Sequence, residues 1–502
     1  MPPTTSETHS LWLATAPTTQ YPRLDGDLEF EVAVVGGGVA GLTTALLLKR
    51  AGLRVAVLEA GRVGHGVTGC TTAKVSALQS TMYSTISKRH GQEVAQVYAT
   101  ASLAGVERLA ALAAEEAIDC HLVRRDAYTY GLEASERPKI EQEMAAAEAA
   151  GLPVAFVESF DLPYPVHGAV RLADQVQIQP VRYVQGLAAA IDGDGSAVFE
   201  NTRVRGVREG TPARVRSEDG PEVRAGHVVI ATHYPILDRG LYFARLKQQR
   251  SYCIAARLAS GTPPRSMSIN PGSTTRSIRD EEELLIVGGE GHSAGDTSAQ
   301  PERFERLADF AREHWDVAEV THRWSAQDPI SYDHLPMIGA YRPGTSNLWV
   351  SSGFMKWGFS TATFAATILT DAIQGHHSEW AETFSPNRLS PKSLPEAAQL
   401  GGKFVTDMAV DRLRRPTTRS ADEIPVGEAR VVPEKGAGRK GVYRDEDGTL
   451  HAVSIRCTHM YCILRFNSAE RSWDCPCHGS RFDVDGAVLE GPAVTPLEGR
   501  EP

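Results

Sequence analysis

The sequence has no run of about eighteen apolar residues, the length that a helix needs to span a bilayer. Its first residues are rich in Thr, Pro and Ser and lack a charged start followed by an apolar core, so we expect no signal peptide. Basic residues are also scarce, since 52 Lys and Arg face 62 Asp and Glu for a net charge of -10. These absences predict a cytoplasmic protein without a membrane span, and they argue against nucleic acid or an anionic membrane as its main partner.

Seven cysteines are too few for a fold built on disulfides, but four of them gather near the C-terminus. Cys457-Thr-His459 is followed, after 15 residues, by Cys475-Pro-Cys477-His478. A Rieske-type 2Fe-2S cluster needs two thiolates on one iron and two imidazoles on the other. Cys457, Cys475, His459 and His478 are therefore the predicted metal ligands. A zinc site is the alternative, although zinc has no need of a spare cysteine in each loop.

The two loops, Cys457-Thr-His-Met-Tyr-Cys462 and Cys475-Pro-Cys-His-Gly-Ser480, resemble the disulfide-containing Rieske domains of respiratory complexes. This resemblance implies that Cys462 and Cys477 cross-link the loops over the cluster. It also implies that Ser480 donates a hydrogen bond to the cluster. Short alternating stretches around the loops predict a small all-β domain.

A second motif lies near the N-terminus, where an apolar strand runs into Gly36-Gly-Gly38-Val-Ala-Gly41 and an Ala/Leu-rich helix. Gly36, Gly38 and Gly41 allow the tight turn and close approach that a pyrophosphate requires, and the helix N-terminus meets its charge. A second strand ends at Glu59, which can accept hydrogen bonds from a ribose, as in unphosphorylated dinucleotide sites. The N-terminal position and a later apolar strand at 227–232 favour FAD over NAD.

The first roughly 375 residues resemble the FAD-dependent amine and amino-acid oxidoreductases, the D-amino-acid, glycine and sarcosine oxidase superfamily. The stretches that resemble this family are 66–74, 284–290, 323–328, 333–339 and Ser352-Gly-Phe-Met-Lys-Trp-Gly-Phe-Ser360. The last implies that Gly353, Lys356, Trp357 and Gly358 lie near the flavin ring. A chain that joins such a flavoprotein to a C-terminal Rieske domain is similar to a known bacterial architecture.

The loop that contains Cys70, Thr71 and Thr72 is expected to border the flavin. Cys70 stands where some relatives carry a histidine bonded covalently to the flavin, so it is either a flavin attachment site or a small packed residue. Lys356 is the first candidate catalytic residue, because a cation over the ring in related enzymes orients a carboxylate or polarises the flavin. Its alternative is a solvated or capping lysine. Tyr252 and His292 are candidates for the substrate face. Their alternatives are a packed aromatic and a histidine in a surface loop.

The expected fold is an α/β Rossmann-like FAD-binding domain with an α+β substrate domain, followed by an all-β Rieske domain. The expected boundaries are an N-terminal arm at 1–28, an oxidoreductase domain at 29–375 with substrate parts at about 111–170 and 236–325, a linker at 376–420 with a docking helix near 403–414, and a Rieske domain at 421–502.

The expected function is oxidation of an amine or amino acid at a C–N bond. Electrons would pass one at a time from FAD to the 2Fe-2S cluster and on to a redox protein or a quinone. One alternative is an NAD(P)H-driven electron-transfer component, which should contain a second G-x-G-x-x-G motif. The other is a non-catalytic redox sensor, which would tolerate a filled substrate cavity. A Rieske oxygenase would need a separate mononuclear iron site, and no region is free to form one.

Overall fold

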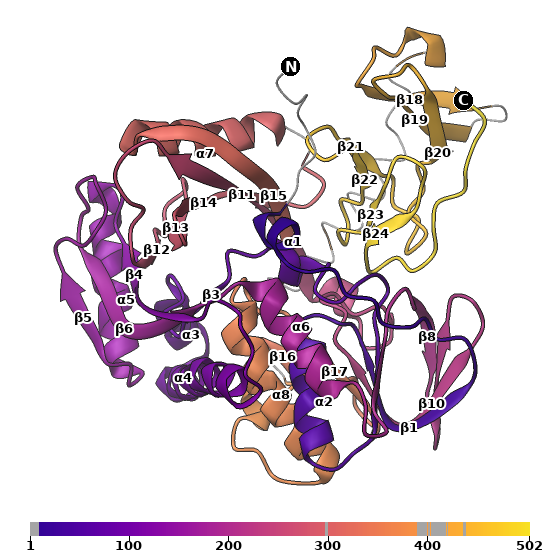
Figure 1. Ribbon diagram of the computed structural model, residues 1–502, viewed down its shortest axis with the longest axis horizontal. Coiled ribbons are helices and arrows are strands. Elements are labelled where there is room, and N and C mark those ends of the chain that lie inside the picture. The colour runs from indigo at the N-terminus through magenta and orange to yellow at the C-terminus, as the bar shows by residue number, and fades with distance from the viewer. Residues whose placement is uncertain are drawn as a thin grey trace.

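The computed structural model describes residues 10–296, 300–388, 418, 420–434 and 438–502, together with the single positions 399 and 402. The predicted docking helix near 403–414 lies outside the described residues. The described chain forms two large sheets with helices around them, and the C-terminal strands form a unit of their own, drawn in orange to yellow (Figure 1). Among the helices of this described part, none is long and apolar enough to cross a membrane.

The first sheet contains the strands that the sequence predicts for nucleotide binding. β1 (Leu28–Val35) lies parallel to β2 (Val55–Leu58) on one side and to β10 (Glu222–Ile230) on the other. The second half of β1 and all of β2 are buried, as expected for Val- and Ala-rich strands covered on both faces. The remaining strands of this sheet are β7 (Ala197–Phe199), β8 (Val204–Arg208), β9 (Ala213–Ser217), β16 (Met337–Ala340) and β17 (Leu348–Ser352).

The second sheet has the order β15-β11-β14-β13-β12-β4-β6-β3 and forms the substrate side of the molecule. Its longest pair is antiparallel, with Leu246 opposite Ser331 at one end. Its strands come from 74–177 and 246–331, and each of these segments lies between segments of the first sheet in the sequence, so the two parts of the oxidoreductase are discontinuous. Its strands are β3 (Lys74–Val75), β4 (Val123–Tyr130), β5 (Val154–Val157), β6 (Ala169–Gln177), β11 (Leu246–Leu258), β12 (Met267–Ile269), β13 (Arg276–Glu281), β14 (Leu284–Ser293) and β15 (Val317–Ser331).

Helices cover both sheets, and most of them share one apolar core, whereas α7 (Gln300–His314) packs in a separate cluster against the second sheet. α2 (Val39–Arg50) starts directly after the glycine turn, with Gly38 as its N-cap. It packs against α8 (Gly358–Gln374), which is apolar along most of its length and almost entirely buried. The other helices are α1 (Leu11–Thr15), α3 (Met82–His90), α4 (Gln92–Glu115), α5 (Arg137–Ala149), α6 (Pro180–Ile191), α7 (Gln300–His314) and α9 (Ala381–Phe384), with short 3-10 turns at Val67–Cys70, Ala134–Glu136, Tyr242–Ala244 and Ala421–Glu423.

The C-terminal unit consists of two antiparallel sheets, in agreement with the predicted all-β domain. Its core is formed by Trp473, Phe482 and Leu464 together with Cys457 and Cys475. The predicted ligand loops therefore start from the centre of the domain. The strands are β18 (Ala429–Glu434), β19 (Gly438–Arg444), β20 (Leu450–Ser454), β21 (Arg465–Asn467), β22 (Ser472–Asp474), β23 (Arg481–Phe482) and β24 (Val488–Glu490).

Candidate active site and cluster site

The turn between β1 and α2 leaves no room for side chains. Gly36 has φ +113°, and a Cβ there would lie 2.5 Å from the carbonyl oxygen of Ala231. A Cβ on Gly41 would lie 2.0 Å from the carbonyl oxygen of Gly36, so the helix rests directly on the turn. The N-terminus of α2 borders a cavity through Gly38 and Val39. This arrangement fits the binding of a dinucleotide pyrophosphate.

Glu59 follows β2 and borders the same cavity. Its carboxylate accepts hydrogen bonds from the N–H groups of Gly37, at 2.6 Å, and Gly61, at 2.8 Å. Burial raises the pKa of Glu59, while these two N–H groups oppose the shift. The backbone thus fixes the carboxylate at the cavity wall, and its contact with a ribose stays a prediction.

The cavity beside the turn has a volume of about 400 Å³, within the range of about 300–1,000 Å³ that is typical of ligand sites. Its walls come from the glycine turn, from the loop at 65–68, from Ala231 to His233 after β10, and from Lys356 and Phe359. The C-terminal unit supplies a further wall, made of Val488, Leu489, Glu490, Gly491, Ala493 and Val494.

A second cavity of about 400 Å³ adjoins the first. It is bordered by side chains from the second sheet, including Lys74 on β3 and Tyr252 and Cys253 on β11. The two cavities share Val67, Thr71, Asp328, Lys356, Gly358 and Phe359 in their walls. A cofactor in the first cavity would therefore meet a substrate in the second at these shared residues.

Lys356 lies at this junction, and its position near a flavin ring stays a prediction. The residue has φ +72° and follows Met355 at φ +54°, two left-handed conformations that are rare for residues other than glycine. Its Nζ donates a hydrogen bond to Ser251 Oγ at 2.9 Å. Burial lowers the pKa of Lys356, while Asp328 opposes the shift. Although the side chain lies deep in the protein, it is accessible to water because it borders both cavities.

Lys74 is another cation that lines the second cavity. Its side chain is buried, with 8% exposed, and its Nζ donates a hydrogen bond to the carbonyl oxygen of Ser268 at 2.6 Å. Burial and the neighbouring guanidinium of Arg279 lower the pKa of Lys74 to about 7. The charge of this lysine therefore changes near neutral pH.

Some of the remaining candidate residues line the cavities and others do not. Tyr252 borders the second cavity and shares a hydrogen bond of 3.0 Å with His292 Nε2. His292 stands behind this tyrosine and lines neither cavity. Trp357 borders the second cavity, and Gly358 borders both. Gly353 lies outside both walls, at φ +73° against Leu246.

Cys70 ends the short Val67–Cys70 turn and borders only the second cavity. Burial raises the pKa of its thiol to about 12, and the carboxylate of Glu490 adds to the shift. A protonated thiol is a poor nucleophile, which favours a packed residue over a flavin attachment site. Thr71 borders both cavities, and Thr72 borders the second.

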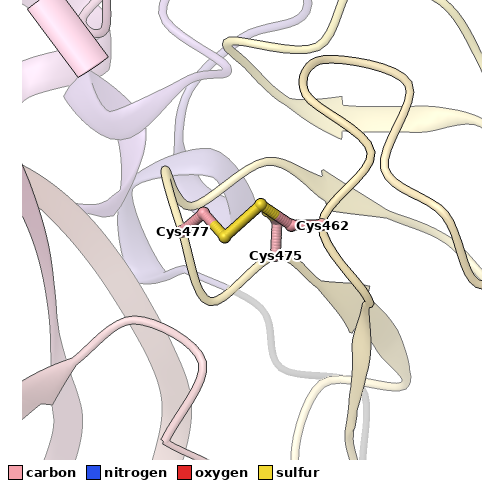
Figure 2. A group of neighbouring side chains, drawn as sticks. All are labelled: Cys462, Cys475 and Cys477. Carbon is pink, nitrogen blue, oxygen red and sulfur yellow. A yellow bond between two sulfur atoms is a disulfide. The ribbon is translucent and has the colours of Figure 1, made fainter. Parts of the chain in front are cut away.

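In the C-terminal unit the two predicted ligand loops face each other. Cys462 and Cys477 are joined by a disulfide, and Cys475 lies beside it (Figure 2). The three sulfurs lie within 4.8 Å of one another, but the two bonded sulfurs are not available as thiolate ligands. Cys457 and Cys475 remain as free thiols in direct contact, and the hydrogen bond from Cys475 lowers the pKa of Cys457. This pair fits the sulfur side of a 2Fe-2S site better than a zinc site.

The two candidate histidine ligands lie next to each other, with ring centroids 5.1 Å apart. His459 Nδ1 is buried and has no hydrogen-bond partner among the described residues, so this nitrogen is available to a metal. The other ring nitrogen, Nε2, lies 2.7 Å from Asp238 Oδ1 of the oxidoreductase part. The ring of His478 lies between Tyr234 and Phe243, at centroid distances of 6.3 and 5.9 Å. Both histidines thus face the segment at 234–243.

A buried network of charges holds the C-terminal unit against the oxidoreductase part. Arg250 on β11, only 1% exposed, pairs with Glu470 and, at 3.2 Å, with Asp474. Arg481 also contacts both carboxylates and lies 3.8 Å from Glu490. Burial alone would raise the pKa of Asp474, but the two guanidinium groups hold it below its usual range. Removing one partner of such a network costs about 3–5 kcal/mol, because the others stay buried without compensation.

Sequence reasoning missed this network and the contribution of the N-terminal arm. Trp12 on α1 is fully buried, and its indole N–H donates to the carbonyl oxygen of Thr71 at 2.6 Å. The arm therefore braces the loop that borders both cavities. A lone aromatic residue between Thr- and Pro-rich stretches is the only sequence signal for this contact.

The fold and the two sites define a flavoprotein oxidoreductase joined to an iron-sulfur domain, and comparisons with known proteins agree. Residues 31–372 match the family model "FAD dependent oxidoreductase", and residues 418–500 match "Rieske [2Fe-2S] domain". The chain belongs to the FAD-dependent oxidoreductase family and carries a C-terminal Rieske domain. Its cofactors are FAD and a 2Fe-2S cluster.

Three relatives illustrate the match. The chain is 31% identical over 493 residues to YhfW of Bacillus subtilis (strain 168), named as a Rieske 2Fe-2S iron-sulfur protein, covering 97% of this chain and 96% of that one. It is 23% identical to gamma-glutamylputrescine oxidoreductase of Escherichia coli (strain K12), over 74% of this chain and 90% of the relative. The crystal structure of glycine oxidase from Geobacillus kaustophilus aligns with a TM-score of 0.61 at 20% identity, over 72% of this chain and 99% of that one.

Proposed function

We propose that this protein oxidises an amine or an amino acid at a C–N bond and passes the electrons singly through its Rieske domain to a separate acceptor. FAD accepts two electrons from such a bond, and a 2Fe-2S cluster transfers them one at a time. The substrate would lose two electrons and two protons to form an imine, which water converts to a carbonyl compound and the free amine or ammonia.

The observation that supports internal electron transfer is the position of the two histidines. Ala231, Thr232 and His233 line the first cavity, and the next residue, Tyr234, packs against His478. A single short segment therefore touches both the cofactor cavity and a candidate cluster ligand. A cluster that served only an external partner would have no need of this contact.

The substrate class is proposed from the charges of the second cavity and from a relative. Among the described residues that line this cavity there are two lysines, Lys74 and Lys356, and one carboxylate, Asp328. Two ammonium groups suit a substrate that carries a carboxylate. The relative named gamma-glutamylputrescine oxidoreductase supports an amine substrate that also bears such a group.

The alternatives receive less support. An NAD(P)H-driven component would need a second nucleotide turn, but residues 284–293 form the single strand β14. A redox sensor with a filled substrate pocket is disfavoured by the open second cavity.

Anaerobic titration tests the proposal. Amino acids, N-methyl amines, polyamines and their γ-glutamyl conjugates would be added singly, with flavin absorbance and the EPR signal of the reduced cluster as readouts. We expect one compound to bleach the flavin, followed by growth of a Rieske signal. Tyr234→Leu should slow the second phase without slowing the first, whereas Tyr234→Phe should leave both unchanged. Rapid reduction by NAD(P)H with no response to any amine would overturn the proposal.

A further inference from the structure

We propose that the Rieske domain completes the FAD site, so that FAD binding and docking of this domain stabilise each other. The inference depends on FAD as the cofactor and not on the proposed substrate class. It assigns to residues 488–494, here called the closing segment, a role in holding FAD in addition to the cluster chemistry of their domain.

The closing segment forms one wall of the FAD cavity. Leu489 is a large apolar residue that is 52% exposed, and it lines this cavity. Glu490 borders the cavity as well, and its Oε1 atom is buried with no hydrogen-bond partner in the described chain. A buried carboxylate oxygen without a donor is costly unless a ligand supplies one. The hydroxyl and N–H groups of FAD are donors of this kind.

Residues of the oxidoreductase part hold the closing segment from the cavity side. Arg203, which also lines the cavity, donates a hydrogen bond to the carbonyl oxygen of Val488 at 3.0 Å. Gln327 donates to Glu490 Oε2 at 2.9 Å and to the carbonyl oxygen of Gly479 at 2.8 Å. The same glutamine therefore joins the FAD wall to the loop that carries His478.

The consequence is thermodynamic coupling. A ligand that contacts both domains binds the docked form more tightly than the undocked form, and it therefore favours docking. By reciprocity, any change that weakens docking must weaken FAD binding by the same factor. Arg250 itself does not line the FAD cavity, and its network reaches the cavity wall through Arg481, which lies 3.8 Å from Glu490.

A glycine at the interface allows docking to be weakened without touching the FAD cavity, and because the residue that it would meet lies in a cluster-ligand loop, the cluster content of each variant is measured as well. Gly295 has φ +77°, and a Cβ there would lie 2.3 Å from Pro476 Cα in the Rieske domain. Gly261 has the same φ of +77° with no atom within 4 Å of its Cβ position. Gly295→Ala and Gly261→Ala therefore introduce the same backbone strain, but only the first introduces a clash between domains.

Each variant would be purified as the full chain with its cluster, freed of flavin and titrated with FAD, with flavin fluorescence as the readout. Iron content and the EPR signal report whether the cluster is intact. We expect Gly295→Ala to weaken FAD binding by about tenfold relative to the Gly261→Ala control, with equal cluster content. The proposal would be overturned if hydrogen exchange shows that the closing segment is freed in Gly295→Ala and the affinity for FAD is nevertheless unchanged.

A measurement on the unmodified protein tests the coupling if Gly295→Ala fails to fold, or if it folds with the closing segment still docked. Amide hydrogen exchange of residues 488–494 would be compared with and without FAD. Coupling requires slower exchange in the FAD-loaded protein, and equal rates contradict it. Neither measurement involves an amine, so a failure here is distinct from a failure of the proposed substrate chemistry.

Discussion

The two ends of the adjoining cavities are built from different parts of the chain. At the pyrophosphate end the walls are mostly backbone, where Gly36 and Gly41 bring the turn and α2 into direct contact. At the substrate end the walls include three charged side chains, Lys74, Lys356 and Asp328, and all three have displaced pKa values. The first end should be intolerant of added atoms. The second should accept substitution and respond to pH.

The largest expected effect is at the backbone end. Gly41→Ala would place a methyl group 2.0 Å from the carbonyl oxygen of Gly36, and the atom it meets is backbone that cannot rotate away. The helix must shift from the turn, so we expect the purified variant to contain almost no FAD. Absorbance at the flavin bands, relative to protein, measures this loss.

Gly52→Ala is the control at the other end of α2, with φ +89° and no atom within 4 Å of the added Cβ. It should retain FAD and lose only about 1 kcal/mol of unfolding free energy from backbone strain. Normal FAD content in Gly41→Ala would show that the turn tolerates side chains and would remove the contrast between the two ends.

Lys356 combines a charged side chain with a left-handed backbone conformation, and two substitutions separate the effects of the two features. Lys356→Met removes the ammonium group and should slow substrate-dependent flavin reduction by about 100-fold. Lys356→Gly should slow it as much, but it also relieves the left-handed backbone at φ +72°. The free energy of unfolding, measured in urea, should therefore be about 1 kcal/mol higher for the glycine variant than for the methionine variant. Equal flavin reduction in all three proteins would leave Lys356 without a role in the reaction.

The contrast also explains which parts of the molecule sequence could predict. The glycine turn and each Cys/His loop are short continuous motifs, so their local geometry depends on neighbours within a few positions. The structure contains the glycine turn before α2 and the two Cys/His loops facing each other. The disulfide between Cys462 and Cys477 is present as well, and it was expected only from the resemblance of the two loops to disulfide-containing Rieske domains. Arg250 and Glu490 belong to no motif, and Gln327 lies in a family-like stretch that does not reveal its contact with Glu490. Their roles arise only when strands more than 100 residues apart meet across the domain interface. His292 was expected on the substrate face, and its position behind Tyr252 depends likewise on how β11 and β14 pair.

The smallest expected effect is a pH dependence at the substrate end. Burial lowers the pKa of Lys74 to about 7, so the ammonium form predominates below this pH and is lost as pH rises through it. A carboxylate ligand bound beside Lys74 should therefore bind more weakly at pH 8 than at pH 6, by about tenfold for a single group titrating near 7.

Acetate is a suitable probe because it stays ionised over this range, and its Kd can be followed by perturbation of the flavin spectrum. Lys74→Met should bind acetate weakly at both pH values, and Lys74→Arg, which stays charged, should bind it equally well at both. A Kd that is independent of pH in the unmodified protein would mean that Lys74 does not face the ligand, and the charge of the substrate end would then rest on Lys356 alone.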